Sequence, residues 1–474
     1  MGQKLVRFFV VYNMYITMAF IRRIKKGDAV YLAKVESYRE DGKVKQRVLE
    51  YVGKEENGVP VQKIDINKLE VANAKQYADI SILYQLAKEL NLNYLLGKHH
   101  KPIIALLIAH LLCKSSVLKM GKWIEYSTIK EVLGLEQLTT EILYRSLDHL
   151  EDCDFEIVEH NIYEYWRKLC PKDSESFVLD VTDTYYNGKH DDSAPRKGKE
   201  GKVSKLIQIG LGVSFENGFP IFHKTYNGSI SNIKVLEDMM RIMAQRGIKS
   251  IIMDRGFYSE ANVKDLHKLN IELIVGVKQS IGIKKNVLAS IDKADIYSSK
   301  HQVILKGTIV YVNEVEFLFG KLIVIYNPKY EVLKKDKMLA DGATDTDVKY
   351  VGFSLIFHNT KLKPGAVVWK YFEKDVVEKS FQTMKGDVQL HPIRLWLPGR
   401  VSAHVKLCYL SMCLLSLIKF RCSKLDLQPG EVLDQLKQIY KVNLKHSQNG
   451  KEFTKVVTLT NLQKNILKAL KCSV

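Results

Sequence analysis

The sequence predicts an α/β protein whose central layer is a mixed sheet, preceded by a mainly helical N-terminal region. From Ser176 onward, three β-type runs are followed by alternating helix-type and strand-type segments up to residue 279, as in a mixed α/β layer. Residues 280–350 interrupt this alternation with further β-type segments. Before Pro171, the apolar residues mostly recur with a helical period.

The N-terminal region divides into a short β element and a helical bundle. Apolar and polar residues alternate over 29–38 and 43–53, on either side of Asp41-Gly42, and this pattern predicts a β-hairpin. Helical periodicity then extends from Asp79 to about Cys170. We therefore assign residues 1–175 to one region that consists of a hairpin and helices.

The later segments predict a catalytic layer in two parts. A strand over 177–186 precedes two strands that flank Glu216-Asn217-Gly218, a second hairpin signal, and the buried strand 249–254 follows a helix. The alternation resumes at residue 351, and Pro364-Gly365 precedes a helix from about Val367. The expected divisions are 176–279 and 351–420 for the layer, 280–350 for a β-rich insertion, and 421–474 for a basic C-terminal helical region.

The composition excludes wholesale disorder and indicates a polyanionic partner. Apolar residues make up 46% and charged residues 26%, as in an ordinary globular protein. Lys and Arg number 72 against 53 Asp and Glu, and the net charge of +19 favours nucleic acid or an anionic membrane. Residues 385–474 carry +10 and residues 1–60 carry +5. Taken alone, each basic region is explained about equally well by a basic face that only contacts solvent. Two basic ends on one chain fit better with DNA that is bound across several domains.

Two features bear on the location of the protein. The apolar stretch from Leu5 to Ile21 is interrupted by Arg7 and Asn13, and its uninterrupted part is too short to span a bilayer, so no membrane partner is expected. The seven cysteines form no CxxC pair and their number is odd, which indicates a reducing compartment and no structural zinc site. We expect a cytoplasmic, DNA-associated protein.

Acidic residues at strand positions are candidates for binding divalent cations. Metal-assisted phosphodiester chemistry uses carboxylates to hold two Mg²⁺ ions about 3.5–4 Å apart. Asp180 lies inside the first strand of the layer, and Asp254 is the last residue of a later strand. Open α/β sheets bind their ligands at such strand ends. Taken singly, each is more commonly a turn or capping residue. Asp183, on the other face of the first strand, is the residue most easily confused with Asp180.

A third acidic residue lies on a predicted helix. Lys374, Glu378 and Lys385 follow Tyr371 by 3, 7 and 14 residues, so all four fall within an arc of roughly 60° on one helix face. An apolar stripe on the adjoining face would bury one side of the helix against the sheet and leave Glu378 in the neighbouring groove. The alternative is a surface helix with ion pairs between successive turns.

Together these motifs resemble those of insertion-sequence transposases that carry an Asp-Asp-Glu triad and a Y-R-E-K signature. The spacing Y-x2-K-x3-E-x6-K has Lys374 in place of the usual Arg, which keeps the charge and loses the bidentate fork. The segments LDVTDTYY and IIMDRGFYSEANV are similar to those that carry the first and second Asp. The central hairpin, the closing segment HPIRLWLPGRVSAHVKLCYLSMCLL and the opening strands are also similar, so the resemblance covers about residues 18–470.

The resemblance implies a ribonuclease-H-like mixed sheet, interrupted by the β-rich insertion, and a catalytic, metal-binding triad of Asp180, Asp254 and Glu378. Asp180 is preferred to its neighbour Asp183 because the family pattern is Asp-x-Thr. The implied cofactor is Mg²⁺, as two ions, for which Mn²⁺ can substitute. Family residues that match Tyr371, Lys374 and Lys385 bind DNA phosphates.

The implied function is that of a DNA transposase, which cuts transposon ends and joins their 3′-hydroxyls to target DNA by two in-line displacements. The partners would be double-stranded DNA, namely terminal inverted repeats and target, with a homodimer assembled on it and residues 1–175 binding the ends. The alternatives are a ribonuclease-H-like nuclease without strand transfer and a DNA-binding transposase relic. All three acidic residues are present, which argues against the relic.

Overall fold

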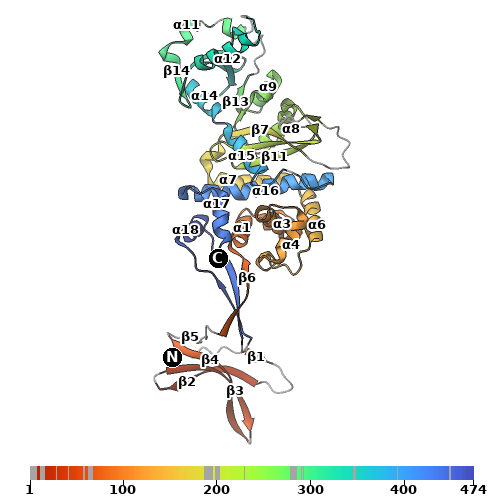
Figure 1. The fold of residues 1–474 in the computed structure, drawn as a ribbon, viewed down its shortest axis with the longest axis vertical. Helices are drawn as coiled ribbons and strands as arrows, with labels where there is room; N and C mark the ends of the chain where they lie inside the picture. Colours follow the sequence, from red (N-terminus) through yellow and green to blue (C-terminus); the bar gives the residue numbers. More distant parts are fainter. Residues whose placement is uncertain are drawn as a thin grey trace. The chain divides into compact units, whose positions relative to one another are not determined.

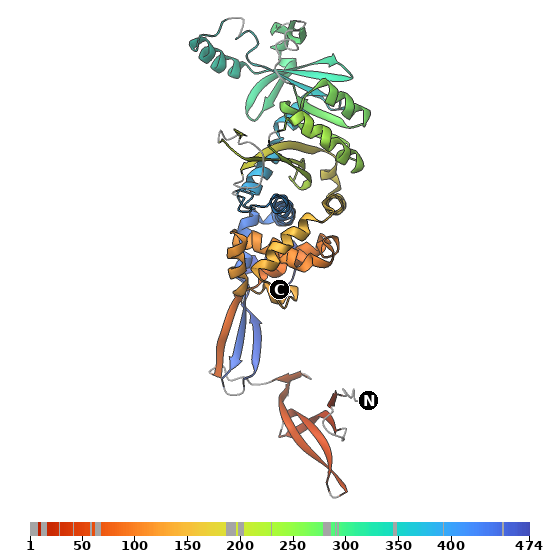
Figure 2. The ribbon, with the colours of Figure 1, turned by 90° about the vertical axis from the view of Figure 1, so that its right-hand side faces the viewer.

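The structure is a computed structural model that describes residues 8–10, 17–27, 29–40, 42–56, 59–61, 68–185, 196–197, 203–228, 230–277, 286–289, 291, 293–344, 348–391, 393–447 and 450–474. The chain forms two compact units. The smaller contains Met1–Ala74 and Val442–Lys455, and the larger contains Lys75–Lys441 and Val456–Val474 (Figures 1 and 2). Part of the apolar stretch from Leu5 to Ile21 lies outside the described residues.

The smaller unit is built from antiparallel strands. Five of them form a sheet in the order β1-β2-β3-β4-β5, and β6 belongs to a second sheet of order β19-β18-β6. The predicted hairpin is present, since Glu40 of β3 pairs with Lys43 of β4. The strands are β1 Phe8–Val10, β2 Thr17–Lys26, β3 Ala29–Glu40, β4 Lys43–Glu56, β5 Val59–Val61, β6 Leu69–Gln76, β18 Tyr440–His446 and β19 Glu452–Val456.

The prediction of a mainly helical N-terminal region is therefore wrong for the residues before Ala78. The hairpin exposes backbone groups along both of its edges, and such edges recruit further strands. Accordingly, β2 pairs with β3 and β5 pairs with β4. In a separate sheet, β6 joins a strand from the C-terminal region. The latter pairing joins segments more than 350 residues apart, so no local pattern reveals it.

A helical bundle begins at Ala78, one residue before the predicted start, and its last helix ends at Leu169. Most of α3 is buried, from Ile103 through Leu111. The bundle helices are α1 Ala78–Glu89, α2 Leu92–Leu95, α3 His100–Cys113, α4 Val117–Glu125, α5 Ile129–Leu133, α6 Thr140–Glu151 and α7 Phe155–Leu169.

Helix α16, Pro398–Cys422, lies between the bundle and the main sheet. It contacts α3 and α6 on one side and β11 on the other, and it is seen nearly end-on in Figure 2. Among the described residues, this helix with its 3-10 extension is long and apolar enough to cross a membrane, and 83% of its apolar window is buried inside the protein. That degree of burial is the property of a core helix. The helical segments Gly97–Cys113 and Val117–Glu125 are also long and apolar enough when they are counted as one span, but they are bent by 94° relative to each other.

The main sheet has nine strands in the order β11-β10-β7-β12-β13-β17-β16-β15-β14. Strand β10 pairs antiparallel with both β7 and β11, whereas β12 pairs parallel with both β7 and β13. The predicted mixed α/β layer is thus confirmed. Its first elements are β7 Phe177–Tyr185, β10 Leu206–Ser214, β11 Pro220–Asn227, α8 Asn232–Gln245, β12 Ser250–Met253, α9 Glu260–Lys268 and β13 Glu272–Gly276.

The predicted insertion does not form a separate sheet. Its strands β14 Gln302–Leu305, β15 Thr308–Phe317 and β16 Gly320–Tyr326 extend the main sheet through β17, Phe353–His358, and it also contains helix α12, Pro328–Ala340. In the C-terminal region, the predicted helices α17 Pro429–Lys437 and α18 Asn461–Leu470 are separated by the β18–β19 hairpin, which the sequence analysis did not predict.

Candidate active site at three carboxylates

Two aspartates meet at the centre of the main sheet. Asp180 lies within β7, where buried apolar residues on either side hold the strand in the core. Strand β12 runs parallel to β7 with Met253 opposite Leu179, so the next residue, Asp254, follows beside Asp180. Because the strands are parallel, the end of one lies next to an interior position of the other.

A glutamate from a helix completes the group. Helix α15, Asp375–Lys385, packs on β7 and β10 (Figure 1). It buries Val377, Phe381 and Met384, while Glu378 is exposed. Asp180, Asp254 and Glu378 line one pocket together with Val178, Leu179, Lys374 and Val377. Carboxylate oxygens are the ligands that hard divalent cations take, so these side chains fit a cation site.

Asp183 lies apart from this group. Its side chain is buried, and it does not line the pocket that contains Asp180. Strand alternation places residues 180 and 183 on opposite faces of β7, because side chains on a strand point alternately to the two sides. The choice of Asp180 over Asp183 agrees with this geometry.

Tyr371 and Lys374 both contact Asp254. The Tyr371 hydroxyl donates a 3.2 Å hydrogen bond to Oδ1 of Asp254, and Nζ of Lys374 lies 3.7 Å from the same oxygen. Burial, together with the neighbouring carboxylate, raises the pKa of Tyr371 above its usual range, so the hydroxyl keeps its proton. A hydrogen bond and an ion pair from one chain segment thus meet at one oxygen of Asp254.

The predicted continuous helix through these residues is broken. Helix α14, Pro364–Phe372, ends at Phe372, and α15 begins at Asp375. The ammonium of Lys306, in the turn between β14 and β15, donates to the Phe372 carbonyl at 3.0 Å and to Oδ2 of Asp375 at 2.8 Å. A carbonyl at a helix end has no intrahelical partner, and Lys306 supplies one. The predicted single helix face is therefore wrong, although Tyr371, Lys374 and Glu378 still converge.

Lys385 is not part of this convergence. It is the last residue of α15, seven residues beyond Glu378, which corresponds to roughly 10 Å along a helix. It does not line the carboxylate pocket. The structure thus brings together five of the six predicted site residues and leaves Lys385 about two turns away.

Two residues that shape the site, Gly276 and Lys306, are not among those predicted from the sequence. Gly276, at the end of β13, leaves space for Tyr371, since a Cβ atom there would lie 2.2 Å from the Tyr371 hydroxyl oxygen. Lys306 and Gly307 form a two-residue turn with positive φ angles of 47° and 78°. The Lys-Gly pair between two β-type runs signals this turn, but no local signal says which helix end the lysine reaches.

The chain is similar to known transposases. Residues 171–414 match the family described as "Transposase DDE domain", and residues 21–72 match "IS1634 family transposase, N-terminal domain". None of the curated proteins matches in sequence. A piggyBac transposase synaptic complex with hairpin DNA aligns at 9% identity and a TM-score of 0.42, over 77% of this chain and 80% of that one. A Mos1 transposase paired-end complex with left transposon end aligns at 11% identity and a TM-score of 0.16, over 43% of this chain and 60% of that one.

The DDE match covers more than half of the chain and includes all three pocket carboxylates. The chain belongs to the transposases with a DDE domain, which are metal-dependent enzymes of DNA cleavage and strand transfer. The N-terminal match makes it an insertion-sequence transposase.

Proposed function

We propose that Asp180, Asp254 and Glu378 are the catalytic, metal-binding residues of this transposase. The observation that supports this assignment is that three carboxylates from β7, the end of β12 and α15 line one pocket. The cofactor we propose is a pair of Mg²⁺ ions, replaceable by Mn²⁺. Such ions, when bound to carboxylates, activate the attacking oxygen and stabilise the leaving oxygen of a phosphodiester.

The protein's own residues orient the substrate and the carboxylates. Tyr371 restrains the rotation of Asp254 through its hydrogen bond, and Lys374 places a positive charge beside the same carboxylate. We propose that Tyr371, Lys374 and Lys385 bind DNA phosphates, with Lys385 contacting the backbone about two helical turns from the cleaved bond. Lysine acts here as a point charge, because it lacks the planar fork of arginine.

The strand order favours the ribonuclease-H-like class. Three antiparallel strands, β11, β10 and β7, are followed by β12 and β13 parallel to β7, and Asp180 lies on the first of these strands in sequence. We propose residues 176–279 and 351–420 as the two parts of the catalytic domain, 280–350 as an insertion that widens its sheet, and 421–474 as a basic C-terminal region.

The DNA partners we propose are the terminal inverted repeats and the target duplex. Residues 1–175 would bind the ends, and a homodimer assembled on DNA would hold two of them. The charge of +5 over residues 1–60 and +10 over 385–474 supports contacts to phosphates at both ends of the chain. A DNA-associated, cytoplasmic location follows from this proposal.

Cleavage of DNA that carries the gene's own flanking sequences tests the assignment. We expect nicking at the repeat boundary with Mg²⁺ or Mn²⁺, none with EDTA, and none with Glu378→Gln, which keeps DNA binding. Asp387→Asn is the matched control, because Asp387 is an exposed acidic residue beyond the end of α15 that does not line the pocket. Cleavage retained by Glu378→Gln or Asp180→Asn would refute the triad, and binding without cleavage by the wild type would favour a DNA-binding relic.

A further inference from the structure

Two histidines and a cysteine meet inside the larger unit, at residues that the carboxylate pocket does not include. His110 belongs to α3, and His404 and Cys408 belong to α16. All three side chains are buried. Sγ of Cys408 lies 3.7 Å from Nε2 of His110 and 3.7 Å from Nε2 of His404. The three possible ligand atoms all lie within 4.8 Å of one another.

The two nitrogen–sulfur separations suit a tetrahedral metal ion. With metal–nitrogen bonds of about 2.0–2.1 Å and a metal–sulfur bond of about 2.3 Å, tetrahedral angles place nitrogen and sulfur roughly 3.5–3.6 Å apart. Both nitrogen–sulfur separations at Cys408 are 3.7 Å. His404 and Cys408 are four residues apart on α16, so they share one helix face, and α3 supplies the third group.

Hydrogen bonds also connect these three side chains to one another and to the main chain. The Cys408 thiol can donate its one proton to an imidazole nitrogen or to the Val388 carbonyl, whose oxygen lies 3.9 Å from Sγ, and its sulfur can accept from an imidazole N–H. The rings also interact with the main chain after α15, His110 at Val388 and His404 at Gln389 and Leu390. Main-chain partners of this kind fix the tautomer and orientation of metal-binding histidines.

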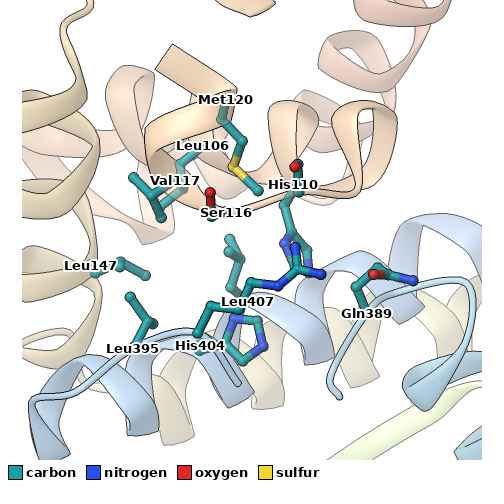
Figure 3. Close-up of a pocket in the computed structure, with 12 residues that line it drawn as sticks. Leu106, His110, Ser116, Val117, Met120, Leu147, Gln389, Leu395, His404 and Leu407 are labelled. Atoms are coloured by element: carbon teal, nitrogen blue, oxygen red, sulfur yellow. The ribbon is translucent and has the colours of Figure 1, made fainter. Parts of the chain in front are cut away.

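Space for a fourth ligand lies beside the cluster. His110 and His404 extend from facing helices into one pocket, which Ser116 and Gln389 also line (Figure 3). Arg394 and Ser115 belong to the same lining. The pocket has room for a water molecule, and metal sites with three protein ligands commonly complete their coordination with water.

Burial of the cluster disfavours charge on all three of its side chains. It lowers the pKa of His110 to about 3 and the pKa of His404 to about 4. Burial raises the pKa of the Cys408 thiol in the absence of a cation. A bound dication would favour the thiolate and would offset part of the cost of burying it.

We propose that His110, His404 and Cys408 bind one divalent transition-metal ion of the zinc type, which ties α3 of the bundle to α16. Thiolate and imidazole ligands select such ions over Mg²⁺, so this site is chemically distinct from the carboxylate pocket. The expectation of no structural zinc site rested on the absence of CxxC pairs. Here the ligands come from two helices nearly 300 residues apart in sequence, which no short motif encodes.

Metal content and cobalt substitution test the proposal on the full chain, purified without a polyhistidine tag. We expect about one equivalent of zinc per chain by mass spectrometry of the metals. After exchange with Co²⁺, we expect a thiolate-to-cobalt charge-transfer band and the visible bands of tetrahedral Co²⁺. Carboxylate-bound Co²⁺ gives no thiolate band, so the measurement separates the two sites.

Cys408→Ser should lose the charge-transfer band and most of the zinc. Cys413→Ser is the matched control, because Cys413 is also buried on α16 and is not in the cluster. Wild-type protein that contains no stoichiometric metal and gives no charge-transfer band with Co²⁺ would overturn the proposal. Since that result needs no variant, a folding defect in Cys408→Ser cannot obscure it.

Discussion

The Tyr371 hydroxyl donates a 3.2 Å hydrogen bond to Oδ1 of Asp254, and Lys374 lies 3.7 Å from the same oxygen. Both side chains come from the short segment where α14 ends and α15 begins. One oxygen of a proposed catalytic carboxylate is therefore fixed by residues that belong to the predicted signature. Preorganisation of this kind holds a ligand near its productive geometry.

Removing the Tyr371 hydroxyl should impair catalysis more than folding. We expect Tyr371→Phe to reduce metal-dependent cleavage by about 10–100-fold, the usual cost of losing a partner that orients a metal ligand. The measurement is the cleavage rate as a function of Mn²⁺ concentration, with the thermal midpoint measured in parallel. Tyr330→Phe, at an exposed tyrosine of α12, is the control. An unchanged rate and metal dependence for Tyr371→Phe would contradict the orienting role.

Gly276 should matter through Tyr371. Gly276→Ala would place a Cβ atom 2.2 Å from the Tyr371 hydroxyl oxygen, so the ring must move and its hydrogen bond to Asp254 must weaken. We expect the single variant to lose cleavage activity. In the double variant with Tyr371→Phe the hydroxyl is absent, so the two losses should be clearly less than additive. Strict additivity would indicate that Gly276 acts by another route.

Lys306 should position the helix break from within the insertion. Its ammonium contacts the Phe372 carbonyl and Asp375, and this pairing raises the pKa of Lys306 and lowers that of Asp375. Because the pair is largely exposed, Lys306→Ala should change stability little. We expect a several-fold loss of cleavage that Lys306→Arg partly restores.

The control for Lys306 is Lys300→Ala in the same insertion. Lys300 is also exposed and forms an ion pair with Asp295 at 2.8 Å. Equal effects of the two alanine variants on cleavage would show that Lys306 has no special position.

A buried ion pair between α8 and α7 should be important for stability. Nη2 of Arg246 lies 2.9 Å from Oε2 of Glu159, whose other oxygen accepts from the backbone and Nδ1 of His223 at 2.8 and 2.6 Å. Arg246→Met leaves a buried carboxylate without its cation, at an expected cost of about 3–5 kcal/mol. Urea unfolding measures this loss of stability. Adding Glu159→Gln to the Arg246→Met variant should recover part of the lost free energy of unfolding.

The same two helices supply a matched exposed pair. Arg241 and Glu156 are 3.1 Å apart at the surface, so Arg241→Met should cost less than about 1 kcal/mol. Similar costs at the buried and exposed pairs would contradict the burial argument.

Asp79 should make stability decrease as pH rises. Burial raises its pKa, opposed by hydrogen bonds from Gln76 and the Ile80 amide. A raised folded-state pKa means that the folded protein binds the proton more tightly, so stability is greatest below the unfolded pKa and is lost as pH rises through the folded one. Asp79→Asn should therefore stabilise the protein at neutral pH, with the gain shrinking on acidification. A gain that is constant with pH would exclude titration as the cause.

Local pattern predicts candidates for the site, and the family resemblance selects among them. Strand positions make Asp180 and Asp254 candidates, and a helix position between two lysines makes Glu378 another. The error concerned the helix itself, because periodicity across 371–385 is compatible with one straight helix as well as with two. At the break, the Phe372 carbonyl accepts a hydrogen bond from Lys306, which lies 66 residues earlier in the chain.

What the sequence by itself determined was the set of elements whose signal is local: the two hairpins, the alternating layer, the bundle from Ala78 and the acidic residues at strand and helix positions. Tertiary structure alone decided the pairing of β6 with β18, the joining of the insertion to the main sheet and the meeting of His110 with Cys408. The physical reason is that strand edges and buried polar groups are satisfied by whichever partner the fold brings near. The local sequence shows which residues form these edges and polar groups, but their partners are distant in sequence.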